Sequence, residues 1–195
     1  MKLIDISQEV FSCVVFGDDP APSAQCLCRM EEGALYNLSA FSMCAHNGTH
    51  IDAPYHFLAR GKAIDAMMLD AFVGDCYVAR LQGDVTAADA ERVLQCARAV
   101  GAGERILLAG ALAVTADAAR VFAAAGIKLI GNESQTVGPE QTPMEVHHIL
   151  LGAEVALLEG IRLADVAEGR YFLSAAPLNL AGFEGAPCRA YLIES

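Results

Sequence analysis

The sequence predicts an α/β or α+β fold built on a mixed β-sheet. Between about residues 84 and 160, segments with helix signals alternate with short apolar runs that are typical of buried strands. The two ends of the chain are mostly strand-like. A chain of 195 residues with 54% hydrophobic residues suits one core, so we expect a single domain over residues 1–195.

Eight runs are predicted as strands because they are short, apolar and bounded by Gly, Asp or Pro. They are Lys2–Ile6, Leu35–Cys44, Cys76–Leu81, Arg105–Leu108, Ile127–Ile130, Val155–Leu158, Tyr171–Ala176 and Arg189–Ile193. A further strand-like run, Val10–Phe16, precedes residues 17–23, which are rich in Gly, Asp and Pro. This composition predicts an ordered surface loop.

Three helix starts follow the capping pattern of Ser or Thr before an apolar run. They are Thr86 with Asp89, Thr115, and Thr142 with Glu145. The first helix should run to about Val100, and Gly126 is placed to end the second. The third start is the strongest, because Pro143 would occupy the first helical position.

The charge balance disfavours several classes of partner. The formal net charge is −11, which repels nucleic-acid phosphates and anionic lipid headgroups.

The longest apolar run, Ile106–Val114, has nine residues. A membrane-spanning helix needs about 18 to 20. Asp5 and Glu9 interrupt the region where a secretory signal would be apolar, so we expect a cytoplasmic protein.

The seven cysteines do not suggest a disulfide framework or a cysteine zinc site, because their number is odd and no CxxC pair occurs. Cys26 and Cys28 are open to interpretation as a redox or metal pair. Two small residues on one face of an extended segment are the better explanation.

The histidines form two groups, and the first predicts a metal site. His46, His50 and His56 lie within eleven positions. In an extended stretch His50 and Asp52 point to the same side, and a bend at Gly48 would bring His46 to join them. Imidazoles with a carboxylate suit Zn²⁺, Mn²⁺ or Fe²⁺. The alternative is a polar turn with solvated histidines, which three histidines and one carboxylate make the weaker interpretation.

The second group is the adjacent pair His147 and His148 in the third predicted helix. Consecutive helical residues point about 100° apart, so at most one of the two faces a given site. Downstream, Glu159 ends an apolar strand, where a carboxylate is costly to bury unless it is paired or bound to metal. The alternative is a strand end that reaches solvent, which is how we interpret Glu154.

The segment HNGTHIDAPYH at 46–56 resembles HxGTHxDxPxH, the signature of the cyclase family, which includes bacterial kynurenine formamidases and isatin hydrolase. Further segments resemble other elements of that family, so the resemblance spans nearly the whole chain. These segments are 5–7, 17–20, 147–151, 158–160 and 185–190.

The resemblance implies a swivelling β/β/α-type fold, a homodimer or higher homo-oligomer, and one or two divalent ions, usually Zn²⁺ and sometimes Mn²⁺. It implies that His46, His50 and Asp52 hold the first metal and that Asp52 bridges to a second. The second would be held by His147, with Glu159 contacting either ion or both. His147 is preferred to His148 because it lies twelve positions before Glu159, the family spacing. His56 would donate and accept protons.

Two segments depart from the family pattern and bear on the substrate. Phe16 stands where the family's loop carries Pro, and Val15 stands at a position that is commonly aromatic. We expect Phe16 to supply the substrate-ring contact. Glu133 and Gln135 replace the family's Asp and Pro, which we expect to change the wall of the pocket.

These observations predict a metal-dependent hydrolase that cleaves a small amide, cyclic amide or ester, as an arylformamidase does. A metal lowers the pKa of its water from about 15.7 to near 7, and a histidine with a pKa of about 6.5 suits proton transfer to the leaving nitrogen. Formylkynurenine is one candidate substrate, and cyclisation or lactone opening would use the same groups.

One alternative is a non-catalytic, metal-dependent small-molecule binding protein that kept the fold, although such a protein does not need His56. A weaker alternative is a cysteine-dependent enzyme using Cys44.

Overall fold

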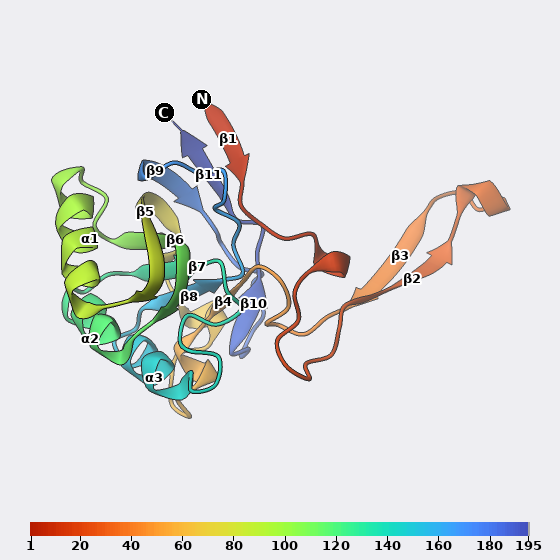
Figure 1. Cartoon of the computed structure of the whole chain (residues 1–195). Coiled ribbons are helices and arrows are strands. Elements are labelled where there is room, and N and C mark those ends of the chain that lie inside the picture. The colour runs from red at the N-terminus through yellow and green to blue at the C-terminus, as the bar shows by residue number, and fades with distance from the viewer. Residues whose placement is uncertain (195) are drawn as a thin grey trace.

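The computed structural model describes residues 1–194, apart from the side chain of Leu112. Its centre is a nine-stranded mixed sheet in the order β1-β11-β9-β5-β6-β7-β8-β4-β10 (Figure 1). The strands are β1 (Lys2–Asp5), β4 (His50–Asp52), β5 (Val73–Val85), β6 (Arg105–Val114), β7 (Leu129–Asn132), β8 (Ala156–Glu159), β9 (Gly169–Ser174), β10 (Gly185–Pro187) and β11 (Tyr191–Glu194). Strands β5 to β8 are parallel, and the pairs outside them are antiparallel. The predicted mixed α/β fold is confirmed.

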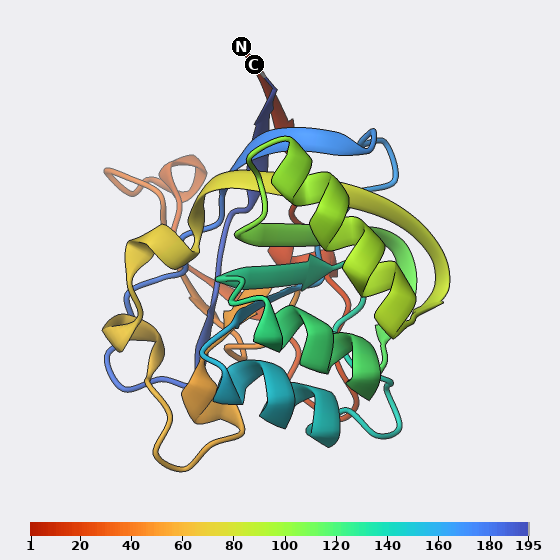
Figure 2. The ribbon, with the colours of Figure 1, turned by 90° about the vertical axis from the view of Figure 1, so that its left-hand side faces the viewer.

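Three helices connect the successive parallel strands and lie together over one face of the sheet (Figures 1 and 2). They are α1 (Ala87–Ala99), α2 (Ala116–Ala124) and α3 (Met144–Gly152). The predicted cap of α1 is confirmed, because Thr86 and Asp89 each accept a hydrogen bond from the other's backbone N–H. Thr115 caps α2 in the same way, and Gly126 follows its end with a φ of 68°.

Two hydrophobic cores hold the sheet from opposite faces. Beneath the helices, Val93, Phe122, Ile130 and Leu150 belong to one buried cluster. On the other face, a second cluster includes Ile51, Phe72, Leu107, Leu158 and Leu173. Burying one such side chain contributes about 1.5–3 kcal/mol to stability. Strands β7 and β8, next to the site described below, are therefore held by packing on both faces, and Ile51 anchors β4 in the second cluster.

Five of the eight predicted strands are found within two residues of their predicted bounds, and the further strand-like run was a wrong prediction. The run Val10–Phe16 is not a strand: residues Val10–Ser12 form a 3₁₀ turn because the Glu9 carboxylate accepts hydrogen bonds from the backbone N–H groups of Phe11 and Ser12. The long strand expected over 35–44 shortens to β3 (Leu38–Ser42). Strands β5 and β6 are longer than predicted: polar residues at the ends of β5 hid its continuation, whereas β6 continues through Gly110 and small alanines, which have low strand propensity.

The start of α3 also differs from the prediction. Pro143, and not Thr142, is the N-cap residue, and no side chain caps this helix. Thr142 instead donates its backbone N–H to the carbonyl oxygen of Pro139 at 3.0 Å. The carbonyl of Pro143 thereby faces the first turn of the helix, where His147 uses it.

Strand β2 (Ser23–Cys28), which the sequence did not predict as a strand, pairs with β3 in a separate two-stranded sheet. We call residues 23–42 the arm, because they project away from the body of the molecule (Figure 1). Its strand residues are exposed except for the half-buried Cys28. Among the described residues, no disulfide forms, and no helix is both long and apolar enough to cross a membrane.

Candidate metal centre

The candidate site lies where the carboxyl ends of β7 and β8 meet the antiparallel strand β4. Such ends are the usual binding edge of parallel sheets. His50 and Asp52 alternate on β4 and therefore point to the same side. The β4–β8 register places His50 opposite Glu159, the last residue of β8. His147 reaches the same place from the first turn of α3.

Five side chains form two groups of three that share Asp52. In the first group, the Asp52 Oδ1 atom lies 2.9 Å from His46 Nδ1 and 3.3 Å from His50 Nε2. In the second group, His147 Nε2 lies 3.7 Å from Asp52 Oδ2 and 3.4 Å from Glu159 Oε1. The donor atoms of each group lie within 4.8 Å of one another. The two oxygens of Asp52 therefore face different groups, as a carboxylate that bridges two ions requires.

Two of the histidine rings are oriented by backbone carbonyls. His50 Nδ1 lies 3.0 Å from the carbonyl oxygen of Gly48, and His147 Nδ1 lies 2.8 Å from that of Pro143. A carbonyl oxygen only accepts hydrogen bonds, so each Nδ1 carries a hydrogen, and Nε2 is the atom that faces the carboxylates and would bind an ion. This second hydrogen bond is typical of metal-binding histidines.

The site needs positive charge to balance its carboxylates. Asp52 and Glu159 are both buried. Although burial opposes ionisation, hydrogen bonds from His46 and His50 hold the pKa of Asp52 well below its usual value. Burial lowers the pKa of His50, but the contacts with Asp52 and Glu159 outweigh it and raise that pKa to about 10. Nitrogen and oxygen donors around two buried carboxylates fit a divalent cation, which would take the place of these protons.

His56 lies beside both groups without belonging to either. Its Nε2 is 4.0 Å from Asp52 Oδ2, and its ring stacks on that of His46 with 4.0 Å between centroids. Burial lowers the pKa of His56, which favours the neutral ring. The side chain keeps 29% of its surface exposed, so it can meet a substrate.

For three residues the sequence left open whether the side chain is buried in the site or faces solvent, and the structure shows which holds. His147 is buried in the site, whereas His148 is exposed and its Nε2 lies 3.3 Å from the carbonyl oxygen of Phe57. Glu159 is buried, so the solvent-exposed alternative for it was wrong. Glu154 is exposed, as expected, and forms an ion pair with Lys62 at 2.7 Å.

A cavity of about 290 Å³ opens over the five donors. Phe16 lines it, as do Gln135 and residues that the sequence reasoning missed, namely Asp19, Phe57, Thr136 and Pro143. Gln135 donates from Nε2 to the carbonyl oxygen of Gly48 at 2.9 Å. Glu133 does not line this cavity, because its carboxylate accepts the backbone N–H groups of Gly110 and Leu163. The expected change in the pocket wall therefore involves Gln135 and not Glu133.

Comparison with known proteins shows the family to which the chain belongs. A family model described as "Putative cyclase" matches residues 4–139. The chain belongs to the cyclase family. It is 33% identical over 206 residues to a kynurenine formamidase of Salinibacter ruber, covering 98% of this chain and 97% of the relative. A kynurenine formamidase of Erythrobacter litoralis is also 33% identical, over 182 residues that cover 85% of this chain and 81% of that protein.

Solved structures of cyclase-family proteins share the fold. A structure described as a potential metal-dependent hydrolase with cyclase activity superposes with a TM-score of 0.81 at 29% identity, covering 100% of this chain and 99% of the other.

Proposed function

We propose that this cyclase-family protein is a metal-dependent hydrolase that cleaves a small amide, cyclic amide or ester. One observation carries the proposal: two three-donor groups share the carboxylate of Asp52 beneath a cavity of about 290 Å³. The kynurenine formamidase relatives place the reaction among hydrolyses of carbon–nitrogen bonds other than peptide bonds.

The metal assignment follows the donor chemistry. His46, His50 and Asp52 would hold a first ion, and Asp52, His147 and Glu159 a second. Three imidazoles and two carboxylates suit Zn²⁺, with Mn²⁺ as the alternative and one or two ions per chain. When bound, the metal would polarise the carbonyl and lower the pKa of water.

The protein's own residues then handle the proton. In amide hydrolysis, water adds to the carbonyl carbon, the carbon–nitrogen bond breaks, and the leaving nitrogen takes up a proton. His56 is neutral, half-buried and next to Asp52, so it can accept the proton of the attacking water and pass it to the leaving nitrogen. Asp52 stays ionised, because hydrogen bonds from His46 and His50 stabilise its charged form and hold its pKa well below the usual value.

The cavity favours a small aromatic substrate. Phe16, Phe57 and Pro143 supply apolar walls, and neither Lys nor Arg is among the described residues that line it. A formylated aromatic amine fits these walls, with N-formylkynurenine as one member of that class.

His56→Ala tests this function directly. The variant should keep its metal and lose turnover of an arylformamide by about 10²–10⁴-fold, mainly in kcat, because proton delivery acts in the transition state. Metal content is measured on the same sample. Loss of metal would make His56 a ligand, and full activity would make it a bystander. A wild-type protein that binds metal and arylformamide without turnover would instead be a binding protein.

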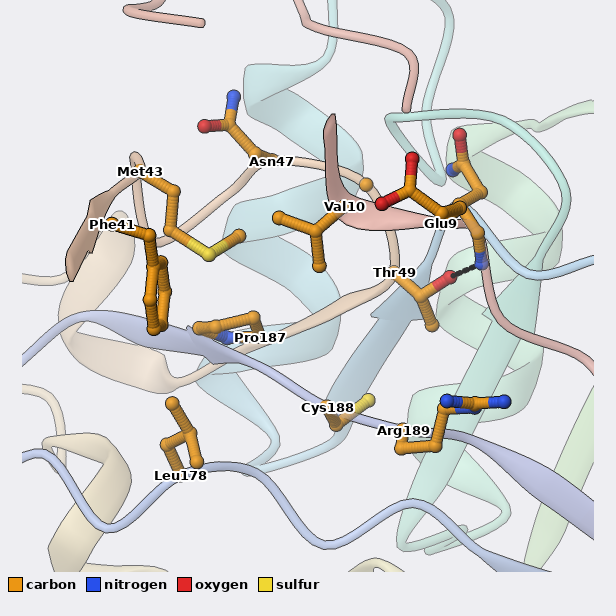
Figure 3. Close-up of a pocket in the computed structure, with 12 residues that line it drawn as sticks. Glu9, Val10, Phe41, Met43, Asn47, Thr49, Leu178, Pro187, Cys188 and Arg189 are labelled. Carbon is orange, nitrogen blue, oxygen red and sulfur yellow. Dashed lines mark hydrogen bonds between the residues drawn. The ribbon is translucent and has the colours of Figure 1, made fainter. Parts of the chain in front are cut away.

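The arm supports a homodimer. Its two strands carry no charged residue in a chain of net charge −11, and an isolated two-stranded sheet is marginal in water. Large apolar side chains on and around it are exposed: Leu27, Met30, Leu35, Tyr36, Leu38 and Phe41. At its root, Phe41 and Met43 border a mainly apolar cavity of about 360 Å³ together with Leu178 and Pro187 (Figure 3).

A second copy of the chain is the partner that fits this surface, because the uncharged strands of the arm let two strongly acidic chains meet there without direct charge repulsion. Light scattering should give twice the mass of the 20.6 kDa chain. Leu35→Glu with Phe41→Glu should give a monomer, whereas Met68→Glu, an exposed apolar residue outside the arm, should leave a dimer. A wild-type monomer at micromolar concentration would contradict the proposal.

We also place the protein in the cytoplasm. Its seven cysteines are free thiols in the described structure, which suits a reducing compartment. A cysteine-dependent mechanism has little support, since Cys44 Sγ faces the Asp19 carboxylate at 3.9 Å and Cys44 is not among the residues that line the metal cavity.

A further inference from the structure

Glu184 lies behind the first group of metal donors, and no sequence motif identified it as part of the site. It comes directly before β10, and its backbone carbonyl accepts the N–H of Ala53 at 2.9 Å. The pairing of β10 with β4 brings its side chain to the ring of His46. Its Oε1 lies 3.4 Å from His46 Nε2, on the opposite edge of the ring from Asp52.

His46 differs from the other two metal-donor histidines in how its ring is held. His50 and His147 are each fixed by a backbone carbonyl on Nδ1, and they offer Nε2 to the site. His46 has the reverse arrangement, because its Nδ1 faces Asp52. Its Nε2 is buried and has no hydrogen bond within the usual geometry among the described residues. The Glu184 carboxylate is the acceptor at that edge.

The faces of the ring are already confined. A Cβ atom at Gly185 would lie 2.8 Å from His46 Cε1, so the glycine lets the backbone approach one part of the ring closely. The ring of His56 stacks on His46 at an interplanar angle of 26°. Such packing confines the faces of the ring, while the contacts at Nδ1 with Asp52 and at Nε2 with Glu184 hold its two nitrogen edges.

We propose that Glu184 is a positioning residue that accepts a hydrogen bond from His46 Nε2–H and thereby holds the Nδ1 lone pair toward the metal. This inference rests on the proposed function, because it requires an ion at His46. The negative charge also increases the basicity of the ring, as a carboxylate does behind a zinc-bound histidine. Glu184 itself stays half-exposed and touches neither the reacting atoms nor the second group of donors.

Metal affinity is the measurement that tests this role, with Zn²⁺ competed against a chelating dye and Co²⁺ as a spectroscopic probe. Glu184→Ala should weaken Zn²⁺ binding at the site that contains His46 by about 10–100-fold. It should also shift the visible Co²⁺ bands, because the His46 ring is no longer fixed. Glu184→Gln should lie between Ala and wild type, since its amide oxygen still accepts a hydrogen bond. Glu140→Gln removes an exposed carboxylate that does not line the metal cavity and should match wild type in both measurements.

Circular dichroism of each variant shows whether it is folded, and the isosteric Glu184→Gln keeps the test valid if Ala is unstable. Zn²⁺ affinities and Co²⁺ spectra that are the same in wild type, Glu184→Gln and Glu184→Ala would overturn the role of Glu184 while leaving the metal-dependent function intact. A wild-type protein that binds neither Zn²⁺ nor Co²⁺ would overturn the proposed function, and this inference with it.

Discussion

His50 on β4 lies directly opposite Glu159 on β8, with 3.5 Å between Nε2 and Oε2. This register joins donors that are more than a hundred residues apart in sequence, and it does so with backbone hydrogen bonds. The precise placement of the site therefore depends on strand pairing, while the loops around it set what can enter.

Asp52 should matter more for metal binding than any other donor, because each of its oxygens faces a different group. Asp52→Asn removes the charge that both ions would share and should abolish high-affinity binding of at least one ion. His148→Ala should bind metal like wild type, since His148 faces the backbone of Phe57 outside the site. Elemental analysis and metal titration of Asp52→Asn and His148→Ala measure the difference in metal binding between the two variants. Equal losses in both variants would contradict the choice of His147.

Removing metal should destabilise the protein, because two buried carboxylates then keep only protons on histidines as counter-charge. An ion present at about 1,000 times its dissociation constant adds about 4 kcal/mol, which is about 8–16 °C in Tm for a chain of this size. Differential scanning calorimetry before and after chelation measures this change in Tm. Adding Zn²⁺ back should restore the Tm, and an unchanged Tm on chelation would argue against a metal bound by the buried donors.

Phe16 should affect substrate affinity and not metal content. It lines the cavity but contributes no donor atom. Phe16→Ala should raise KM for an arylformamide about 10-fold or more, since burying an aromatic ring against another contributes about 1–3 kcal/mol. Phe11→Ala is the matched control, because Phe11 is also exposed and lines neither the metal cavity nor the one at the arm. Similar KM changes in both variants would remove Phe16 from the substrate site.

The ion pair between Asp5 and Arg189 should make stability depend on pH in the acid range. Arg189 lowers the pKa of Asp5 from 3.8 to about 2 in the folded protein. The stabilisation is thus complete above pH 3.8 and is lost as the pH falls through 2. Asp5→Asn should cost about 1 kcal/mol or less at pH 7, because the pair is partly exposed. The difference from wild type should shrink toward pH 2.

Urea denaturation at several pH values measures this dependence. Asp165→Asn, a change at an exposed carboxylate with no ion pair among the described contacts, is the control and should show no such trend. A constant difference between wild type and Asp5→Asn from pH 7 to pH 2 would show that the pair does not stabilise the fold through its charge.

The sequence predicted those parts of the fold and site that depend on neighbouring residues. The α1 and α2 caps are local hydrogen bonds, and the donors at 46, 50 and 52 lie in one bent segment, so both could be read from spacing. Strand β4 has only three residues, two of them polar, and gives no strand signal by itself. Its existence depends on pairing with β8 and β10, which are distant in sequence.

The same reason explains the residues that were missed. Glu184 reaches His46 only through the β10–β4 pairing, and Asp19 lines the cavity through the path of a loop. Thr142 is of a residue type that commonly caps helices, yet Pro143 is the N-cap residue. The reason is that the backbone N–H of Thr142 bonds to the carbonyl oxygen of Pro139 in the preceding turn. Neither long-range pairing nor the direction of a turn can be derived from residue types alone.

The arm and the first metal donor are joined by a very short piece of chain. Strand β3 ends at Ser42, and His46 follows four residues later. Between them, buried Asn47 closes a turn by bonding both the N–H and the carbonyl of Cys44. This turn connects the arm, whose far end lies outside the body of the molecule, directly to the segment that carries the metal donors. A partner that binds the arm would therefore hold the chain only four residues before the first metal donor, so contacts at the arm and the placement of His46 share one short segment.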